Sequence, residues 1–385
     1  MAADGGPGRA RGRWLGLALV LALGICLGIV ARGPGRLRPG SRSGYVYGTV
    51  VAVGSATRPG RVRLRGGQVV TAQVEPPPGA AATTPSILLP RFAVGDRVQV
   101  AYEVGPGGRT TYAVTDWERL PVVLALLWVF VAAVAWVARW QGLRALAGTA
   151  ASLAVLVLFV VPEILAGRDP LGVALLGAGG ILALSMFVVH GFNWKTVAAV
   201  AGTAATVMLA VGLGWASLRL GHVAGFGDEE TVYVAVADGR VDLPGLVLAS
   251  VVVGALGALV DVTVSQASTV AELARARPDL GYGALYARGM RVGYDHIGSL
   301  VNTLALAYAS SALPVLLLLR LAGTGLRAEL NGELLAFQLI HVLVGGIALV
   351  LAVPATTVLA ALLFAHGRVP VPAAEGAHGH PHVHA

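Results

Sequence analysis

The feature that most constrains this chain is a series of apolar runs, each long enough to cross a lipid bilayer, that fills the sequence from Leu120 onward. A crossing helix needs about 20 predominantly apolar residues. The runs predict membrane helices near residues 120–138, 145–162, 171–190, 196–218, 244–265, 296–319 and 334–364. The sequence therefore predicts an integral membrane protein that is mainly a helical bundle.

The composition excludes an ordinary soluble domain. Only 12% of the residues are charged and 56% are hydrophobic, whereas about a quarter of a soluble domain is charged. The net charge is +8, but the arginines are scattered between apolar runs and form no basic stripe with interleaved aromatics, which argues against nucleic-acid binding. The single cysteine, Cys26, excludes a disulfide within the chain and argues against cysteine-based metal chemistry. We expect no cofactor.

An eighth apolar run, residues 14–31, follows a basic N-terminal segment, residues 1–13. It has the positive front of a signal peptide but lacks an A-x-A-like cleavage site. The sequence favours an uncleaved membrane anchor, and a cleaved signal peptide is the alternative. Residues 32–43 follow as a linker rich in proline, glycine and arginine.

Residues 44–117 have a different character from the apolar runs. The stretches "YVYGTVVAV", "GRVRLRGGQVVTAQV" and "GDRVQVAYEV" are short, rich in β-branched residues and alternating. They predict five or six strands in a small β-barrel of the OB or sandwich type. The segment holds no Cys, His or carboxylate cluster, so we expect a structural or docking module, and a possible site for a protein partner.

The charges of the short loops predict the orientation in the membrane. Loops 139–144, 190–196 and 266–295 are basic, and loop 226–242 on the opposite side is mixed or acidic. With eight helices, the positive-inside rule puts both termini in the cytoplasm and residues 44–117 outside. Residues 118–365 then form a seven-helix transmembrane domain, and residues 366–385 a cytoplasmic tail.

The stretch "GALGALVDVTVSQAST", residues 254–269, places a carboxylate inside an apolar run. Neighbours on one helix face recur at i+3 and i+4. Asp261, Ser265, Ser268 or Thr269, and Glu272 therefore form one polar stripe. A charge at the centre of a membrane helix costs about 2.5–3.5 kcal/mol. We expect Asp261 to face the bundle or a water-filled cavity, with a partner.

The stretch "GYDHIGSLVNTLALAY", residues 293–308, repeats this arrangement. Asp295, Ser299 and Asn302 fall on one face, with His296 and Thr303 beside them. Two consecutive helices with such stripes could coordinate a cation, carry protons or bind a small polar solute. Alternatively, these hydroxyl and amide groups only hold helices together, at about 0.6 kcal/mol for each hydrogen bond.

Four blocks of the sequence resemble the signature blocks of the YibE/F-like family of bacterial multi-pass membrane proteins. They are "GALGALVDVTVSQAST", "RGMRVGYDHIGSLVNTLALAYASSALPVLLL", "HGFNWKTVAAVAGT" and "LVGGIALVLAVPATT", and the resemblance extends over about residues 45–365. Asp261, Asp295, Asn302 and Thr303 match the family's pattern. Tyr294 departs from it, because the family usually has arginine there. The resemblance implies a multi-pass protein of the bacterial inner membrane and suggests transport.

The C-terminal tail is rich in histidine. Its alternating residues His378, His380, His382 and His384 could bind zinc, nickel or copper weakly. Such a tract could instead sense pH through imidazole titration, or belong to a disordered tail without either role.

The sequence favours a permease or channel-like transporter of an ion or small polar solute. In this hypothesis Asp261 binds the cation or proton, and Ser265, Asn302, Thr303 and Asp295 line the path. The alternative is a non-transporting scaffold whose β module docks a partner. We do not expect an enzyme, because the chain has no GxxxxGK[ST], H-E-x-x-H or G-x-S-x-G motif. A proton-sharing aspartyl pair needs carboxylates about 3 Å apart, and Asp261 and Asp295 are expected at different depths.

Overall fold

A computed structural model describes residues 43–54, 60–74, 91–105, 108–226, 229–237, 239–323 and 325–365. These residues belong to two compact units, divided between Leu146 and Ala147. The predicted anchor at 14–31 and the histidine-rich tail lie outside the described residues.

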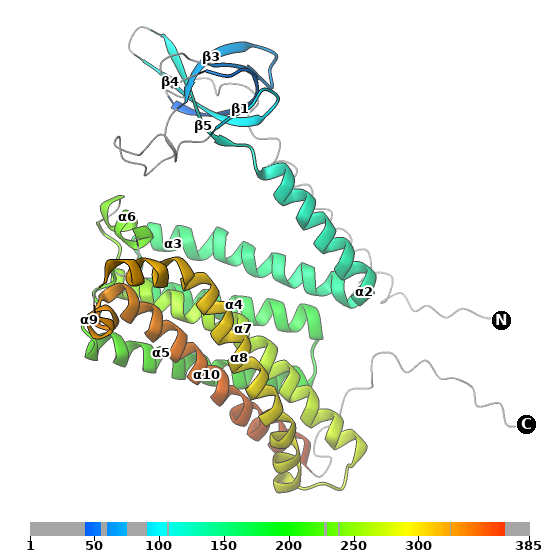
Figure 1. Cartoon of the computed structure of the whole chain (residues 1–385). Helices are drawn as coiled ribbons and strands as arrows, with labels where there is room; N and C mark the ends of the chain where they lie inside the picture. Colours follow the sequence, from blue (N-terminus) through cyan, green and yellow to red (C-terminus); the bar gives the residue numbers. More distant parts are fainter. Residues whose placement is uncertain are drawn as a thin grey trace, which may run out of the picture. The chain divides into compact units, whose positions relative to one another are not determined.

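The first unit contains a small closed β-barrel (Figure 1). Its strands follow the order β1-β2-β3-β5-β4, and β3 and β5 are parallel whereas the other neighbours are antiparallel. The strands are β1 (Ser43–Ala52), β2 (Gly60–Leu64), β3 (Val69–Val74), β4 (Arg97–Val104) and β5 (Thr110–Trp117). The predicted barrel between the linker and the helices is therefore confirmed.

Alternation of side chains builds the core of the barrel. Val46, Val62, Val98 and Val100 are at most 1% exposed and pack together inside. The residues between them point outward, because successive side chains of a strand lie on opposite faces. This period of two is the pattern from which the sequence predicted the strands.

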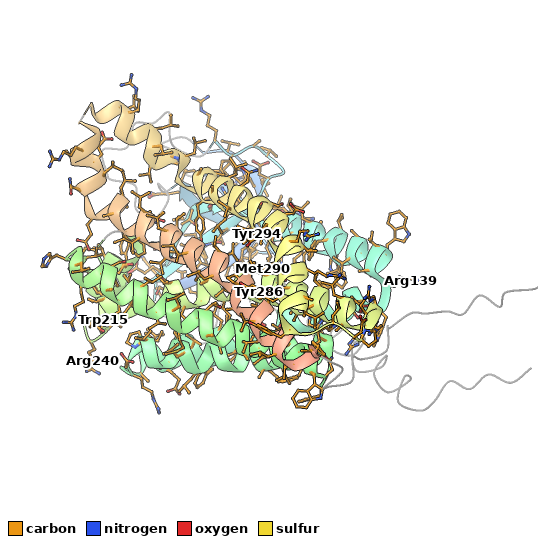
Figure 2. The ribbon with its side chains drawn as sticks, turned by 90° about the horizontal axis from the view of Figure 1, so that it is seen from below. Arg139, Trp215, Arg240, Tyr286, Met290 and Tyr294 are labelled. Carbon is orange, nitrogen blue, oxygen red and sulfur yellow. The ribbon has the colours of Figure 1, made fainter. Side chains whose placement is uncertain are left out.

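The barrel leads directly into a long helical run. The run comprises α2 (Leu120–Val155), the π-helical turn η2 (Leu156–Val160) and α3 (Val161–Leu165). It breaks at Arg139, whose φ of 48° and ψ of −129° are not helical and which lies where two segments of α2 meet (Figure 2). The break coincides with the predicted loop 139–144, so the predicted helices 120–138 and 145–162 lie on either side of it.

The second unit is a helical bundle in which α7 is central. Helix α7 packs against α4, α5, α8 and α10 (Figure 1). The elements are α4 (Pro170–His190), α5 (Trp194–Leu220), α6 (Glu229–Ala237), α7 (Leu243–Ala276), α8 (Tyr282–Ala322), α9 (Leu326–Asn331) and α10 (Glu333–Phe364).

Side-chain caps fix where three of the bundle helices begin. Asp169 accepts a hydrogen bond from the backbone N–H of Gly172 at the start of α4, and Asp242 accepts one from Gly245 at the start of α7. Asn193 caps α5 in the same way. Such caps satisfy backbone donors that have no partner within the helix.

Five helical segments of the described part are long and apolar enough to cross a membrane. They are Leu120–Leu165, Pro170–Phe187, Trp194–Leu220, Leu243–Ala276 and Glu333–Phe364. The predicted helix 296–319 lies within α8, which begins earlier than predicted. The protein is therefore a mainly helical membrane protein, and eight crossings remain a prediction.

Helices α5 and α10 come close together at Gly202. A methyl group built on Gly202 would lie 3.1 Å from the Cβ and 3.3 Å from the Cα of Thr356. Small residues allow such approaches between membrane helices, where dispersion and hydrogen bonds replace the hydrophobic driving force.

We predict that Gly202→Ala destabilises the bundle by about 1–3 kcal/mol, since overpacking forces neighbouring helices apart. Gly212→Ala, in the same helix, is the control, because nothing lies within 4 Å of the added methyl group there. Unfolding of both variants in detergent measures the difference. Equal stability of the two variants would contradict the close contact.

Candidate functional site

The predicted polar stripe of α7 lies on the exposed side of that helix. Asp261 and Ser265 are exposed and Glu272 is exposed further along, whereas Val262 and Gln266 are buried on the other side. Ser268 and Thr269 are half-buried. The stripe passes the middle of a helix that is apolar enough to span a membrane.

The Asp261 carboxylate has no hydrogen bond or ion pair within the part of the chain that the structure describes. Two other groups of the stripe are satisfied locally. Thr269 donates its hydroxyl to the carbonyl of Ser265 at 2.9 Å, and Glu272 pairs with Arg275 at 2.9 Å. The expected partner of Asp261 is therefore not found among the described residues.

The polar stripe of α8 is also exposed, and the bundle does not bring it against the stripe of α7. Asp295, Ser299, Asn302 and Thr303 are exposed, as is His296. No hydrogen bond or ion pair between described residues joins the two stripes. Thr303 donates to the carbonyl of Ser299 in its own helix at 3.0 Å.

A different face of α8 packs on the bundle. Gly289 and Gly293 lie close to Gln266 of α7, and Met290 belongs to the core (Figure 2). Gly293 and Asp295 are two positions apart, which is about 200° around a helix. Asp295 is thereby turned away from the bundle core.

A second polar cluster, absent from the sequence hypothesis, lies buried between helices. We call it the buried polar belt, and it consists of Thr203 of α5, Thr263 and Gln266 of α7, and Thr357 of α10. The hydroxyls of Thr203 and Thr263 are 2.7 Å apart. The Gln266 amide donates to the Gly289 carbonyl at 3.0 Å and to the Thr357 hydroxyl at 2.7 Å.

The belt has a structural role, because its groups satisfy one another. Thr203 and Thr357 also bond to carbonyls four residues earlier in their own helices, at 2.9 and 2.6 Å, as buried threonines of helices commonly do. The sequence showed Gln266 beside Ser265, but not which of the two faces inward. No pattern distinguished Thr203 or Thr357 from other threonines of apolar helices.

A recess of about 520 Å³ opens at the end of the bundle where α4 and α7 begin and α5 ends. The two capping carboxylates, Asp169 and Asp242, line it together with Arg219 and His222. Trp215 is also at this end (Figure 2), and the centroid of its ring lies 5.2 Å from the guanidinium carbon of Arg219. The recess therefore combines charges of both signs, and it was not predicted from the sequence.

Glu333, the first residue of α10, anchors the backbone beside the recess. Its carboxylate accepts hydrogen bonds from the backbone N–H groups of Ala224, Gly225 and Phe226 at 2.9, 2.7 and 3.0 Å. The segment after α5 is thereby tied to the start of α10.

Two features outside the spanning helices concern metal binding and the charge of one carboxylate. Among the described residues, no group of three or more His, Cys, Asp or Glu side chains could hold a metal ion, and the predicted metal ligands His378, His380, His382 and His384 lie outside them. In the turn between α7 and α8, two hydrogen bonds from Arg277 lower the pKa of Asp279 to about 2.

We predict that Gln266→Leu destabilises the bundle by about 1 kcal/mol, since two interhelical hydrogen bonds are lost at about 0.6 kcal/mol each. Ser265→Ala, one residue earlier on the exposed side, is the control and should change stability by less than about 0.5 kcal/mol. Unfolding in a denaturing detergent gives both values. A larger loss of stability for Ser265→Ala than for Gln266→Leu would refute the assignment of Gln266 to the buried face of α7 and Ser265 to its exposed face.

The comparisons with known proteins agree with the sequence resemblance. The family described as YibE/F-like protein matches residues 126–366. No curated protein and no solved structure matches the chain. The match begins within α2, so it leaves out the β-barrel, although the resemblance was expected from about residue 45. It covers most of the chain and includes both polar stripes, and the chain therefore belongs to the YibE/F-like protein family.

Proposed function

We propose that this membrane protein moves an ion or small polar solute as a permease or channel-like transporter, with Asp261 binding the cation or proton. The observation that carries the proposal is the Asp261 carboxylate, exposed near the middle of α7 and without a partner among the described residues. An ionised group at the centre of a membrane helix is costly and is usually functional. Contact with a hydrated path would remove that cost.

The surroundings of Asp261 support a path along α7. Gly254 and Gly257 are exposed on the same side of the helix, and nothing lies within 4 Å of a methyl group built on Gly257. Ser265, one turn after Asp261, adds a hydroxyl. Gly257 leaves room for water and solute on the side of the helix that carries the carboxylate, whereas Gly254 lies against His341 of α10, whose Nε2 would be 2.9 Å from a methyl group built there.

The polar stripe of α8, which the bundle does not bring against the stripe of α7, would supply groups to another part of the path. Asp295, Asn302 and Thr303 are exposed, and carboxylate, amide and hydroxyl oxygens can replace water around a cation. The proposal includes eight crossings of the bacterial inner membrane, with both termini cytoplasmic and the barrel outside. It includes no catalytic role.

The alternative is a non-transporting scaffold whose barrel docks a protein partner. The buried polar belt favours it, because there the polar groups of crossing helices serve only to hold helices together. The barrel also has a core of its own and lies outside the family match. In this function Asp261 would be dispensable.

We predict that Asp261→Asn lowers cation or proton flux at least about tenfold, since the amide cannot provide the negative charge that binds the ion. The measurement is flux into proteoliposomes under an imposed gradient, over a panel of monovalent and divalent ions. Glu272→Gln is the matched control, because it neutralises a carboxylate of the same stripe that is already paired with Arg275. The control should keep native flux.

Two outcomes would decide against transport through Asp261. One is native flux in Asp261→Asn, and the other is a native protein that is silent for every ion of the panel. The scaffold function would then be tested by deleting residues 44–117 and measuring which proteins still co-purify with the full bundle. Unfolding curves of each variant show that loss of flux is not loss of fold.

A further inference from the structure

Arginines of strands β2 and β4 lie on the outer face of the barrel, on either side of strand β1. In the antiparallel register, Thr49 of β1 lies opposite Arg63 of β2 on one side and opposite Arg97 of β4 on the other. All three side chains are exposed. Directly opposite residues have Cβ atoms about 4.5–5.5 Å apart, so two guanidinium groups flank one hydroxyl.

Among the residues that the structure describes, no negative charge compensates these two arginines. The nearby Arg65 is ion-paired with Glu118 and lies over the ring of Tyr47, 5.4 Å from its centroid. The Glu118 carboxylate is therefore already paired, and its side chain is only 4% exposed. Arg63 and Arg97 have no side-chain partner among the described residues.

The same residues enclose a recess of about 490 Å³ on the barrel surface. Thr49, Arg63, Arg97 and Glu118 are among the residues that line it. Glu118 is fixed there by its backbone N–H, which donates to the Arg97 carbonyl at 2.8 Å. The recess therefore offers two free guanidinium groups and a hydroxyl on a rigid three-stranded frame.

The covalent connection to α2 places the recess close to the membrane surface. Glu118 lies two residues before Leu120, a distance of at most about 7 Å along the chain. Residues 120–138 form a helix about 28 Å long, which matches a hydrocarbon core of about 30 Å. The headgroup layer outside that core is only about 5–8 Å thick, so Glu118 falls within it.

The side chains on either side of Glu118 are of types that are common at the membrane surface. Trp117 precedes Glu118, and the Arg119 guanidinium lies 5.8 Å from its ring centroid. Tryptophan and arginine are typical of the boundary between hydrocarbon and water.

We propose that this recess binds a phosphate-type oxyanion through Arg63, Arg97 and Thr49. Guanidinium groups bind phosphate through paired, parallel N–H···O hydrogen bonds, and two of them with a hydroxyl suit an anion that has several acceptor oxygens. The phosphate of an acidic lipid headgroup at the depth of Glu118 and a free phosphate share this chemistry. The site is independent of transport through the bundle.

The test uses the full chain in an uncharged detergent. Native mass spectrometry measures bound phosphatidylglycerol against phosphatidylcholine when both lipids are added in equal amounts, and isothermal titration calorimetry measures binding of inorganic phosphate. The variants are Arg63→Gln and Arg97→Gln, singly and together. Arg109→Gln is the control, because this exposed arginine lies in the turn at the far end of β4 and β5 from Arg97.

We expect roughly 30-fold weaker anion binding in the double variant, since each of the two basic residues contributes about 1 kcal/mol and each 1.4 kcal/mol is a factor of ten. Arg109→Gln should bind as the native protein does. A preference for phosphatidylglycerol that falls in the double variant identifies a lipid headgroup, and phosphate binding that falls without such a preference identifies a free anion. Both results support the site.

Two results would overturn the proposal. The first is no anion binding that depends on Arg63 or Arg97, and the second is an equal loss in Arg109→Gln, which would indicate net charge alone. Both arginines are exposed, so the unfolding midpoint of the double variant should match the native one, and this measurement separates loss of binding from loss of fold.

Discussion

The packing of α4, α5, α8 and α10 around α7 is the constraint on which the helical bundle depends. Lipid is as apolar as leucine, so helices in a membrane gain little from hiding apolar surface and associate through close packing and hydrogen bonds. The bundle uses both. Gly202 lets α5 reach Thr356 of α10, and Gly289 and Gly293 let α8 reach Gln266.

This packing determines which polar groups of α7 remain available. Helices α5, α8 and α10 form hydrogen bonds with Thr263 and Gln266 on one side of α7. The opposite side of α7, with Asp261 and Ser265, is therefore left exposed. The same reasoning applies to α8, where Gly289 and Gly293 face inward while the carboxylate of Asp295, the amide of Asn302 and the hydroxyls of Ser299 and Thr303 are exposed. The polar residues of these helices are thus separated by position, some hydrogen-bonded between helices and others exposed.

The barrel is organised by the alternation of side chains along its strands, and not by helix packing. Apolar side chains point inward along β2 and β4, and Arg61, Arg63 and Arg97 point outward, where water or an anion can solvate their charges. Glu118 connects this face with the helical part of its unit, because it binds Arg65 and is followed after one residue by α2. The charged face of the barrel and the start of an apolar helix are therefore built from adjacent residues.

The sequence by itself determined the kinds of element in this protein but not all their bounds, because residues 266–276 and 282–295, predicted as part of a loop, are helical. Local periodicity is enough to predict the kinds of element, because a period of two predicts strands over residues 44–117 and long apolar runs predict membrane helices. Tertiary structure alone decided which polar residues are buried. Ser265 and Gln266 are neighbours in sequence and both polar, but only the helices packed around α7 make one exposed and the other buried. Likewise Arg63 and Arg97 meet beside Thr49 only because β2 and β4 both pair with β1, and strand pairing between distant segments leaves no local signal in the sequence.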